Sequence, residues 1–412
     1  MEHKKRFDFL STVSPTYVEE VLNSYTPDAK VELVRIDDAC GRVFAEDVLA
    51  PEDLPYFDRS LVDGYAVVSK NSQGASETNP VMLQKKGNVK VGMVPQISVE
   101  DGECVYVNTG AYIPPGADSV VMQEFTREME SVVEILKPVY RGENIIQRGE
   151  DVKNGQIVFK KGKVITPFDI GVCAALGITE LIVFKKPTVG IMSTGDEIVS
   201  PFDNAKEGKV RDVNGYVLFT LFRRLGGQIY YVGIARDEIE DVKVKLSMLR
   251  DSDMFCVSGG SSKGERDLII EAVKELGGDI LFHGVNIKPG KPFFYGLLWG
   301  KPLFGLPGHP LSCIAVTYRF VLPVFFKMLG FESRVPKTLK GILTTNVPST
   351  YGVEEYVNVI VKEVDDKIFV EPLFAKSATI SILSQSSGYI VVDQDREGYE
   401  KEEEVRVFLY EI

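Results

Sequence analysis

Six short pieces of sequence decide how this chain folds. They are KKPTVGIMSTGDEIV (Lys185–Val199), DVNGYVL (Asp212–Leu218), GIARD (Gly233–Asp237), VSGGSSKGERD (Val257–Asp267), IKPGKP (Ile287–Pro292) and GLPGHP (Gly305–Pro310). Most of them follow a short apolar run and combine Gly with Asp, Glu or Lys. Loops of this composition, placed at the ends of parallel strands, converge on one crevice. The stretch therefore predicts a binding or active site supported by the rest of the chain.

Around these loops, the sequence alternates between predicted strands and helices. TVGIMS, QIYYVGIA and DMFCVS are short apolar strands, and amphipathic helical patterns separate them. A further apolar helix is expected over Leu311–Leu329 and is expected to be buried. This alternation predicts a largely parallel, three-layer α/β domain.

The flanking sequence is of a different kind. Between residues 51 and 151, short β runs alternate with Gly and Pro turns, which predicts a small, inserted all-β domain. After Gly330, alternating strands predict a small antiparallel barrel or sandwich. We expect four units: residues 1–50 with 152–184 as an α+β domain, 51–151 as the inserted β domain, 185–330 as the α/β domain and 331–412 as the C-terminal β domain.

Composition narrows the possible functions. The chain has 412 residues and a formal net charge of −12, which argues against general nucleic-acid binding. Its five cysteines form neither a CxxC motif nor a Cys/His cluster, so each is expected to be a buried small side chain in a reducing compartment. The N-terminus lacks the apolar core of a signal peptide, and no apolar run is expected to span a membrane. A cytoplasmic protein is predicted.

The first and fourth loops are candidate anion sites. In STGDE, Ser193, Thr194 and Gly195 end a strand and can present hydroxyl and backbone N–H groups, although a plain turn is the better interpretation of this motif alone. In SGGSSKGERD, glycines after a buried strand allow a ligand to approach the backbone closely. The residues expected to contribute there are Ser258, Gly259, Gly260 and Ser262.

Carboxylates follow several of these strands. Asp237 is either the N-cap of the next helix or a metal ligand, and both are possible at once. Asp267 lies one turn into a helix, where a negative charge also favours the helix dipole. Asp63 stands on a VDG turn of the inserted β domain, where an Asx turn is the simpler interpretation. If Asp63 meets the crevice from another domain or another subunit, it completes a carboxylate set with Glu197, Asp237 and Asp267 that suits Mg²⁺.

The two proline-flanked loops are the most unusual pieces. PGKP and PGHP each hold Gly between prolines, so their backbones are stiff. Lys288 and Lys291 bracket Pro289–Gly290 and could hold an oxyanion as point charges. Of the three histidines, only His309 of PGHP is placed to contribute to the site.

The motifs taken together resemble one family. DLPYFDRSLVDGYAV, NTGAYIPPGADSVV, NIIQRGEDV, STGDEI, SGGSSKGERD, IKPGKP and GLPGHP, in this order, are similar to the MoeA family of molybdopterin molybdenumtransferases, which includes the gephyrin and Cnx1 E domains. The resemblance covers nearly the whole chain. It implies an elongated four-domain fold with a MogA-like α/β domain that binds molybdopterin, a C-terminal β-barrel, and a homodimer whose cleft is shared between the α/β domain and the partner's inserted β domain. It also implies insertion of molybdate into adenylylated molybdopterin with release of AMP, and a requirement for Mg²⁺.

The resemblance also implies roles for individual residues. The implied catalytic residues are Asp63, Glu197, Asp237 and Asp267, and the last three are also the implied metal ligands. The implied substrate-binding residues are Thr109, Asp151, Ser193, Thr194, Gly195, Ser258, Gly259, Gly260, Ser262, Lys288, Lys291, Pro307, His309 and Pro310.

The chain departs from the family at three places and leaves alternatives open. Ile146 stands where the family often has Arg, His309 where Asn is usual, and Lys263 adds a charge beside the SGG loop. These departures leave the choice between molybdate and tungstate open. The alternative functions are a molybdopterin adenylyltransferase, because the α/β domain resembles MogA, and a non-catalytic pterin-binding scaffold. An adenylyltransferase is also a possible partner protein.

Overall fold

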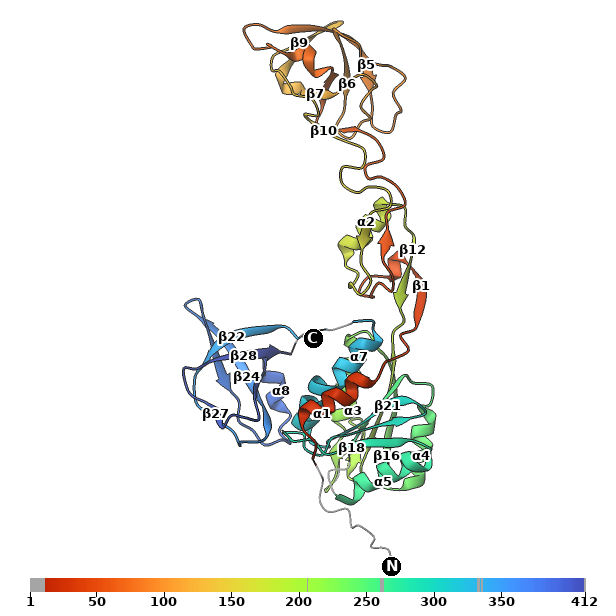
Figure 1. Cartoon of the computed structure of the whole chain (residues 1–412), viewed down its shortest axis with the longest axis vertical. Helices are drawn as coiled ribbons and strands as arrows, with labels where there is room; N and C mark the ends of the chain where they lie inside the picture. The colour runs from red at the N-terminus through yellow and green to blue at the C-terminus, as the bar shows by residue number, and fades with distance from the viewer. Residues whose placement is uncertain (1–11, 206, 260–262, 332–333, 335, 411–412) are drawn as a thin grey trace, which may run out of the picture. The chain divides into compact units, whose positions relative to one another are not determined.

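The chain divides into two compact units, and each is described here by itself. The structure is a computed structural model that describes residues 12–205, 207–259, 263–331, 334 and 336–410. Unit 1 consists of Met1–Glu32 and Phe184–Ile412, and unit 2 consists of Leu33–Val183. Figure 1 shows the chain with many of its helices and strands labelled.

Unit 1 is built on a six-stranded, largely parallel sheet. Its strand order is β16-β13-β17-β21-β20-β18. The first four strands are parallel, and the last two form antiparallel pairs. The strands span Gln228–Ala235 (β16), Thr188–Thr194 (β13), Met254–Ser258 (β17), Lys301–Leu306 (β21), Phe294–Leu298 (β20) and Asp279–His283 (β18). The predicted α/β domain is confirmed. The antiparallel pairing of β20 and β18 at one edge of the sheet was not predicted from the alternation of strands and helices in the sequence.

Helices cover both faces of this sheet. One face carries α1 (Pro15–Ser24), α3 (Asn214–Arg224), α6 (Pro310–Val316) and α7 (Leu322–Met328), and the other carries α4 (Ile239–Met248) and α5 (Lys263–Glu275) (Figure 1). Ser14 caps α1 as expected, because its Oγ accepts a hydrogen bond from Tyr17 N at 3.2 Å. The expectation that this helix belongs with residues 152–184 is corrected, since Val18 and Leu22 pack into the core of the α/β sheet.

The helix that follows PGHP is part of this core. α6 continues through a π-helical turn, Thr317–Val321, into α7. The run Pro310–Met328 is long and apolar enough to cross a membrane, but 72% of its most apolar window is buried inside the protein. Phe320 and Phe325, for example, are fully buried. This burial is that of a core helix, as the sequence predicted.

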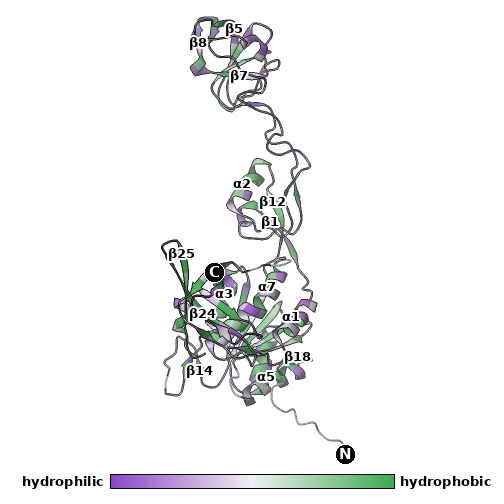
Figure 2. Cartoon of the chain, turned by 60° about the vertical axis from the view of Figure 1, so that its left-hand side comes forward, coloured by the Kyte–Doolittle hydropathy of each residue, from purple (hydrophilic) through white to green (hydrophobic). Residues whose placement is uncertain are grey.

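The C-terminal part of unit 1 is a closed barrel. Its strands are β22 (Thr338–Leu343), β24 (Glu354–Val364), β25 (Lys367–Pro372), β26 (Gly388–Val392) and β28 (Glu404–Leu409), and a β24–β26 pairing closes the sheet. Figure 2 shows hydrophobic residues along β24 and its neighbours. Arg319 of the π-helical turn links this barrel to α1, because it forms ion pairs with both Glu354 and Glu19. The barrel alternative of the prediction is confirmed.

Unit 2 contains a second six-stranded sheet and a smaller α+β part. The sheet has the order β7-β4-β6-β5-β9-β8, formed by Ser119–Met122, Gly64–Val67, Glu103–Val107, Val81–Val89, Val132–Ile135 and Thr126–Met129. The smaller part pairs β1 (Val31–Arg35) with β12 (Glu180–Phe184), pairs β2 (Val48–Leu49) with β11 (Ile157–Phe159), and includes α2 (Pro167–Ala175). The six-stranded sheet lies between two stretches of sequence that pack together. Ala39 and Phe44, which precede it, share one hydrophobic core with Phe159 and Cys173, which follow it, as expected if the sheet domain is an insertion.

Local sequence signals account for several of these elements. Thr166 and Asp169 form the reciprocal capping box that starts α2, with Pro167 at the first helical position. Four of the five cysteines are buried, but Cys40 is exposed, which corrects the expectation that all five are core residues.

Close packing of the central strands leads to a first prediction. A Cβ atom at Gly305 in β21 would lie 1.9 Å from a ring atom of the buried Phe294. We expect Gly305→Ala to destabilise the protein by about 3 kcal/mol, because neither the strand nor the ring can move without losing core contacts. Differential scanning calorimetry should show a transition several degrees lower.

Gly171→Ala in α2 is the matched control. Nothing lies within 4 Å of the added Cβ at that helical position. Its transition should stay unchanged or rise slightly. An equal Tm for Gly305→Ala and the unchanged protein would contradict the packing argument.

Candidate functional site

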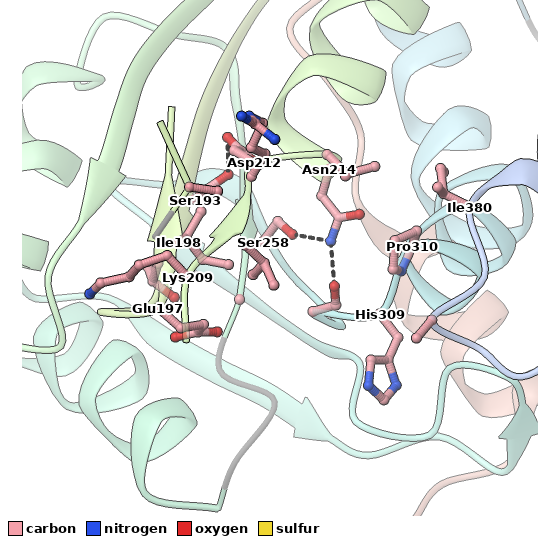
Figure 3. A pocket seen from close by; sticks show the side chains of 18 residues that line it. Ser193, Glu197, Ile198, Lys209, Asp212, Asn214, Ser258, His309, Pro310 and Ile380 are labelled. Atoms are coloured by element: carbon pink, nitrogen blue, oxygen red, sulfur yellow. Dashed lines mark hydrogen bonds between the residues drawn. The ribbon is translucent and has the colours of Figure 1, made fainter. Parts of the chain in front are cut away.

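A cavity of about 510 Å³ opens at the carboxyl edge of the central sheet of unit 1. Its floor comes from the ends of β13 and β17, where Ser193 and Ser258 are paired in register. Figure 3 shows Glu197 and Lys209 on one side of the cavity, His309 and Ile380 on the other, and Ser258 and Asn214 between them. Seven residues predicted from the sequence line this cavity: Ser193, Thr194, Glu197, Ser258, Gly259, His309 and Pro310.

Asp212 is the buried acidic centre of the cavity wall. It is 5% exposed, and its carboxylate accepts hydrogen bonds from Ser193 Oγ at 2.9 Å, from Gly215 N at 2.9 Å and from the Tyr231 hydroxyl. Burial, followed by this bond to Asp212, raises the pKa of Tyr231. The phenol therefore stays protonated and donates, and Asp212 serves to hold the end of β13 against the start of α3.

Asn214, the first residue of α3, joins three segments of the site. Its Nδ2 atom lies 2.8 Å from Ser258 Oγ, 2.8 Å from the Gly308 carbonyl oxygen and 3.3 Å from the Pro307 carbonyl oxygen (Figure 3). One buried amide thus connects the start of α3, the end of β17 and the PGHP loop. Pro307, predicted as a binding residue, contributes its carbonyl group to this connection.

The cavity combines positive ends of helices with cationic side chains. Asn214 starts α3, and His309 stands at the N-cap position of the continuous helix from Pro310 to Met328. Helix starts attract anions, although two N–H groups here already have partners: Gly215 N donates to Asp212 Oδ1, and Leu311 N donates to the Ser377 carbonyl oxygen. Lys209 and Arg211 also line the cavity and are exposed. The His309 ring is held by Ser377, whose Oγ lies 2.9 Å from Nδ1. This arrangement can bind an anionic ligand.

Acidic residues gather beside the cavity around Gly195. Asp196 and Asp237 bind each other reciprocally: Asp196 N donates to Asp237 Oδ2 at 3.1 Å, and Asp237 N donates to Asp196 Oδ1 at 3.2 Å. Glu197 folds back over Gly195, where a Cβ would lie 2.6 Å from Glu197 Oε2 and where φ is +141°. A side chain at Gly195 would displace this carboxylate, so glycine is needed there.

The carboxylate of Asp237 does not cap the following helix. The N-cap residue of α4 is Glu238, without a side-chain capping bond. Asp241 instead accepts from Arg236 N at 2.7 Å, and this bond is the largest cause of the lowered pKa of Asp241. The N-cap interpretation of Asp237 is therefore wrong. The side chain is directed to the STGDE loop, which leaves the interpretation as a ligand residue.

Thr194 carries an unusual hydroxyl at the cavity floor. It is 2% exposed, and among the described residues Oγ1 has no hydrogen-bond partner. Gly259 approaches it so closely that a Cβ there would lie 2.2 Å from Oγ1. A buried unpaired hydroxyl is costly, and one at a binding surface is explained if a ligand or water satisfies it.

The PGKP lysines lie away from this cavity. Lys288 Nζ forms an ion pair of 2.8 Å with Glu355 Oε1 at the start of β24. Lys291 is exposed and is not among the residues that line the cavity. The cations that the structure brings to the site are Lys209 and Arg211 instead, and the expected anion-binding role of Lys288 competes with its carboxylate partner.

Unit 2 brings two of its three predicted residues together. Asp63 Oδ1 accepts hydrogen bonds from Thr109 N at 2.8 Å and from Asn108 Nδ2 at 3.3 Å. The Thr109 bond is the largest cause of the lowered pKa of Asp63. Asp151 lies in a different turn, where its N–H binds the Leu54 carbonyl oxygen at 3.1 Å. The VDG and NTGA turns therefore form one exposed, acidic site, and RGED is separate from it.

Three predicted residues cannot be placed. Gly260 and Ser262 lie outside the described residues, and Asp267 belongs to α5 but its side chain is outside the described part. Within the described residues, no group of three or more His, Cys, Asp or Glu side chains could hold a metal ion. The predicted set of Glu197, Asp237 and Asp267 consequently remains a prediction.

Sequence reasoning named the DVNG segment but assigned no role to four residues that line the cavity, Lys209, Arg211, Asp212 and Asn214. Lys209 and Arg211 lie in a charged turn, and Asp212 and Asn214 lie in DVNG, directly before an apolar helical pattern. A polar pair at the start of a helix usually signals a cap. Their burial, which makes them part of the site, is a property of the tertiary structure alone.

Three protein-family models match successive parts of the chain. The MoeA N-terminal region (domain I and II) matches residues 14–177, the probable molybdopterin binding domain matches 190–327, and the MoeA C-terminal region (domain IV) matches 340–410. The second of these contains the entire floor of the cavity.

Relatives and solved structures agree with these matches. A protein of Methanocaldococcus jannaschii, named for molybdopterin biosynthesis, is 38% identical over 404 residues, covering 95% of this chain and 96% of its own. A molybdopterin molybdenumtransferase of Staphylococcus aureus is 32% identical over 380 residues, covering 92% of this chain and 91% of its own. The crystal structure of a molybdopterin biosynthesis MoeA protein from Pyrococcus horikoshii has a TM-score of 0.87 at 33% identity, covering 97% of this chain and 100% of that one.

The Asn214 connection can be tested directly. We expect Asn214→Ala to lower the free energy of unfolding by about 1–3 kcal/mol, because it removes a buried donor that satisfies several acceptors. Urea denaturation followed by the fluorescence of Trp299, the single tryptophan of the chain, measures this in unit 1. Hydrogen exchange over residues 307–313 should become faster.

Asn23→Ala is the control for Asn214→Ala. Asn23 is exposed, and its Oδ1 accepts a 2.8 Å bond from Lys327 Nζ. The change should be within about 0.5 kcal/mol of zero. Unchanged exchange over residues 307–313 in Asn214→Ala would show that the amide does not hold the loop.

The Asp63 carboxylate should titrate below the ordinary Asp value. Its folded pKa is depressed by the Thr109 and Asn108 donors, so its contribution to stability is present above the unfolded pKa and is lost as pH falls through the folded pKa. A carboxyl-carbon NMR titration should give a midpoint under 3.8, and Asn108→Ala should raise it. A midpoint at or above 3.8 would contradict the bonding seen at this turn.

Proposed function

The chain belongs to the MoeA family, and from this premise we propose that it is a molybdopterin molybdenumtransferase that acts in molybdenum cofactor biosynthesis. The proposed reaction inserts molybdate, or tungstate, into adenylylated molybdopterin. Water cleaves the phosphoanhydride of the adenylate and AMP leaves. The two dithiolene sulfurs bond to the metal while one oxygen of the oxyanion leaves as water with the two thiol protons. The protein is proposed to be soluble and cytoplasmic.

The observation that carries this proposal is the anion-binding cavity at the carboxyl edge of the sheet. Molybdate, the pterin phosphate and the adenylate are all anions, and the cavity presents Lys209, Arg211, His309 and two helix starts. The volume of about 510 Å³ falls within the roughly 300–1,000 Å³ of small-molecule pockets. The Asn214 amide holds the PGHP loop and β17 in place before the ligand arrives, which favours catalysis by positioning.

The acidic residues beside the cavity are proposed to hold Mg²⁺. Glu197 and Asp237 supply carboxylate oxygens at the STGDE loop, and hard oxygen donors fit this cation, although among the described residues they do not belong to a group of three possible ligands. Asp267 is proposed to join them on the strength of its motif. When bound, Mg²⁺ would neutralise phosphate charge during loss of AMP. The chain's own residues would orient the adenylate, with the unpartnered Thr194 Oγ1 and the backbone of the neighbouring Gly259 available to its phosphates.

A homodimer with a shared cleft is proposed to complete the site. Asp63 and Thr109 form an exposed acidic turn, which is suited to face a ligand rather than to stabilise a core. Asp151 is proposed to contribute from its separate turn, and Lys288 and Lys291 to attract the anion from outside the cavity. A molybdopterin adenylyltransferase is a proposed partner that would deliver the substrate. Light scattering that shows only monomer at working concentration would contradict the shared cleft.

The reaction assay tests this function. With adenylylated molybdopterin, molybdate and Mg²⁺, the protein should release AMP, and Asp63→Asn and Asp267→Asn should each lower the rate by about 100-fold or more, as removal of a positioned charge does elsewhere. Asp101→Asn is the control, because Asp101 is an exposed residue that pairs with Lys70 at 2.8 Å. Full turnover in both site variants would reject the carboxylate roles. Absence of AMP with molybdate and with tungstate would favour the scaffold function.

A further inference from the structure

We propose that unit 1 carries a second anion site, a lysine pocket that binds a small tetrahedral oxyanion of the phosphate class. The lysine pocket has a volume of about 180 Å³ and is lined by the side chains of Lys30, Lys185, Lys186 and Lys301, with Asp28 and Asp253. This volume is below the roughly 300–1,000 Å³ of pockets for drug-sized ligands, so its size favours an inorganic ion.

The lysine pocket lies at the edge of the sheet opposite the candidate active site. Lys185 and Lys186 are separated from the start of β13 by Pro187 alone, Asp253 immediately precedes β17, and Lys301 begins β21. All three strands are parallel and end at the cavity described above. The two sites therefore share the same strands but no lining residues.

The charge balance of the lysine pocket is positive although the chain carries −12 overall. Lys30 is paired with Asp253 at 2.9 Å, and Lys301 Nζ is bound by a neutral group, the Arg250 carbonyl oxygen, at 2.7 Å. The structure shows no acidic partner for Lys185 or Lys186 within the residues it describes. An acidic protein that places positive charge in one recess creates a local potential that selects anions.

The two carboxylates of the lysine pocket do not cancel this charge. Asp253 is fully engaged, because Oδ1 accepts from Lys30 and Oδ2 accepts from Thr188 N at 2.8 Å. Asp28 is the other carboxylate. Burial first, and then the charges of Asp253 and Asp28, raise the pKa of Tyr25, which also lines the lysine pocket. Lys30 and Asp253 neutralise each other as an ion pair. The remaining three lysines, Lys185, Lys186 and Lys301, and the one remaining carboxylate, Asp28, give the pocket a net charge of two positive units, which would balance a dianion. Lysine ammonium groups bind phosphate as mobile point charges.

The position of the lysine pocket gives the bound ion a structural role. The chain leaves unit 1 after Glu32 and returns at Phe184, so Lys30 and Lys185 stand on the two segments that connect the units. Lys185 N already donates to the Lys30 carbonyl oxygen at 2.8 Å. An oxyanion held between these lysines would add a second link between the outgoing and returning segments within unit 1.

Calorimetric titration with inorganic phosphate tests the site. The titration uses the full chain in a chloride background of constant ionic strength, with wild type compared with the double variant Lys185→Gln/Lys186→Gln. We expect wild type to bind phosphate and the double variant to lose one site per chain, or to bind there about tenfold or more weakly. Equal isotherms for the two proteins would overturn the proposal.

Two charge-matched double variants locate the effect. Lys160→Gln/Lys161→Gln removes an exposed lysine pair of unit 2, and Lys209→Gln/Arg211→Gln removes the cations of the active-site cavity. Both should keep the lysine-pocket site. If Lys160→Gln/Lys161→Gln loses it as well, the binding reflects overall charge and the proposal is wrong. If only the cavity variant loses phosphate binding, the ion binds at the active site alone and the lysine pocket is again rejected.

Discussion

The side-chain amide of Asn214 is the interaction on which the candidate site depends. Its single nitrogen donates to Ser258 Oγ and to the carbonyl oxygens of Pro307 and Gly308, so three segments distant in sequence share one buried donor. Hydrogen bonds inside a protein are directional and costly to leave unmade. The amide therefore holds the start of α3 and the end of β17 beside the loop before Pro310, and all three segments line the cavity.

The two edges of the central sheet of unit 1 differ in the charged side chains that they carry and in the partners of those side chains. At the carboxyl edge, Asp212 is buried and fully bound, while Lys209 and Arg211 remain exposed toward the cavity. At the amino edge, lysines surround a smaller recess without equal numbers of carboxylates. Parallel strands impose this polarity, because every chain segment enters at one edge and leaves at the other. Both edges are thereby available for ligands, with different loops at each.

Much of the architecture could be predicted because it follows from local chemistry. Ser14, Thr166 and the prolines after them start helices, since a side-chain oxygen satisfies a free N–H group and proline needs none. The apolar periodicity of the central stretch indicated its strands and helices. The packing of α1 against the α/β sheet was not predictable from the sequence. The apolar face of an amphipathic helix can pack against any apolar surface, and its residue pattern does not indicate which surface that is.

The sequence alone determined that the STGDE, DVNG, SGG and PGHP loops gather at the site, since the ends of parallel strands meet at one edge, and its ordered motifs determined the family. The IKPGKP loop, predicted with them, does not line the cavity. Only the tertiary structure decided the roles of side chains within those loops. Lys288 has the right type and spacing for an anion, yet it pairs with Glu355, a residue 67 positions later. Asp237 stands in the sequence where a helix N-cap is expected, yet in the structure it exchanges hydrogen bonds with Asp196. Asp212 and Asn214 look like an ordinary helix start, yet they organise the cavity. A side chain's partner is set by distances through space, which only the folded chain defines.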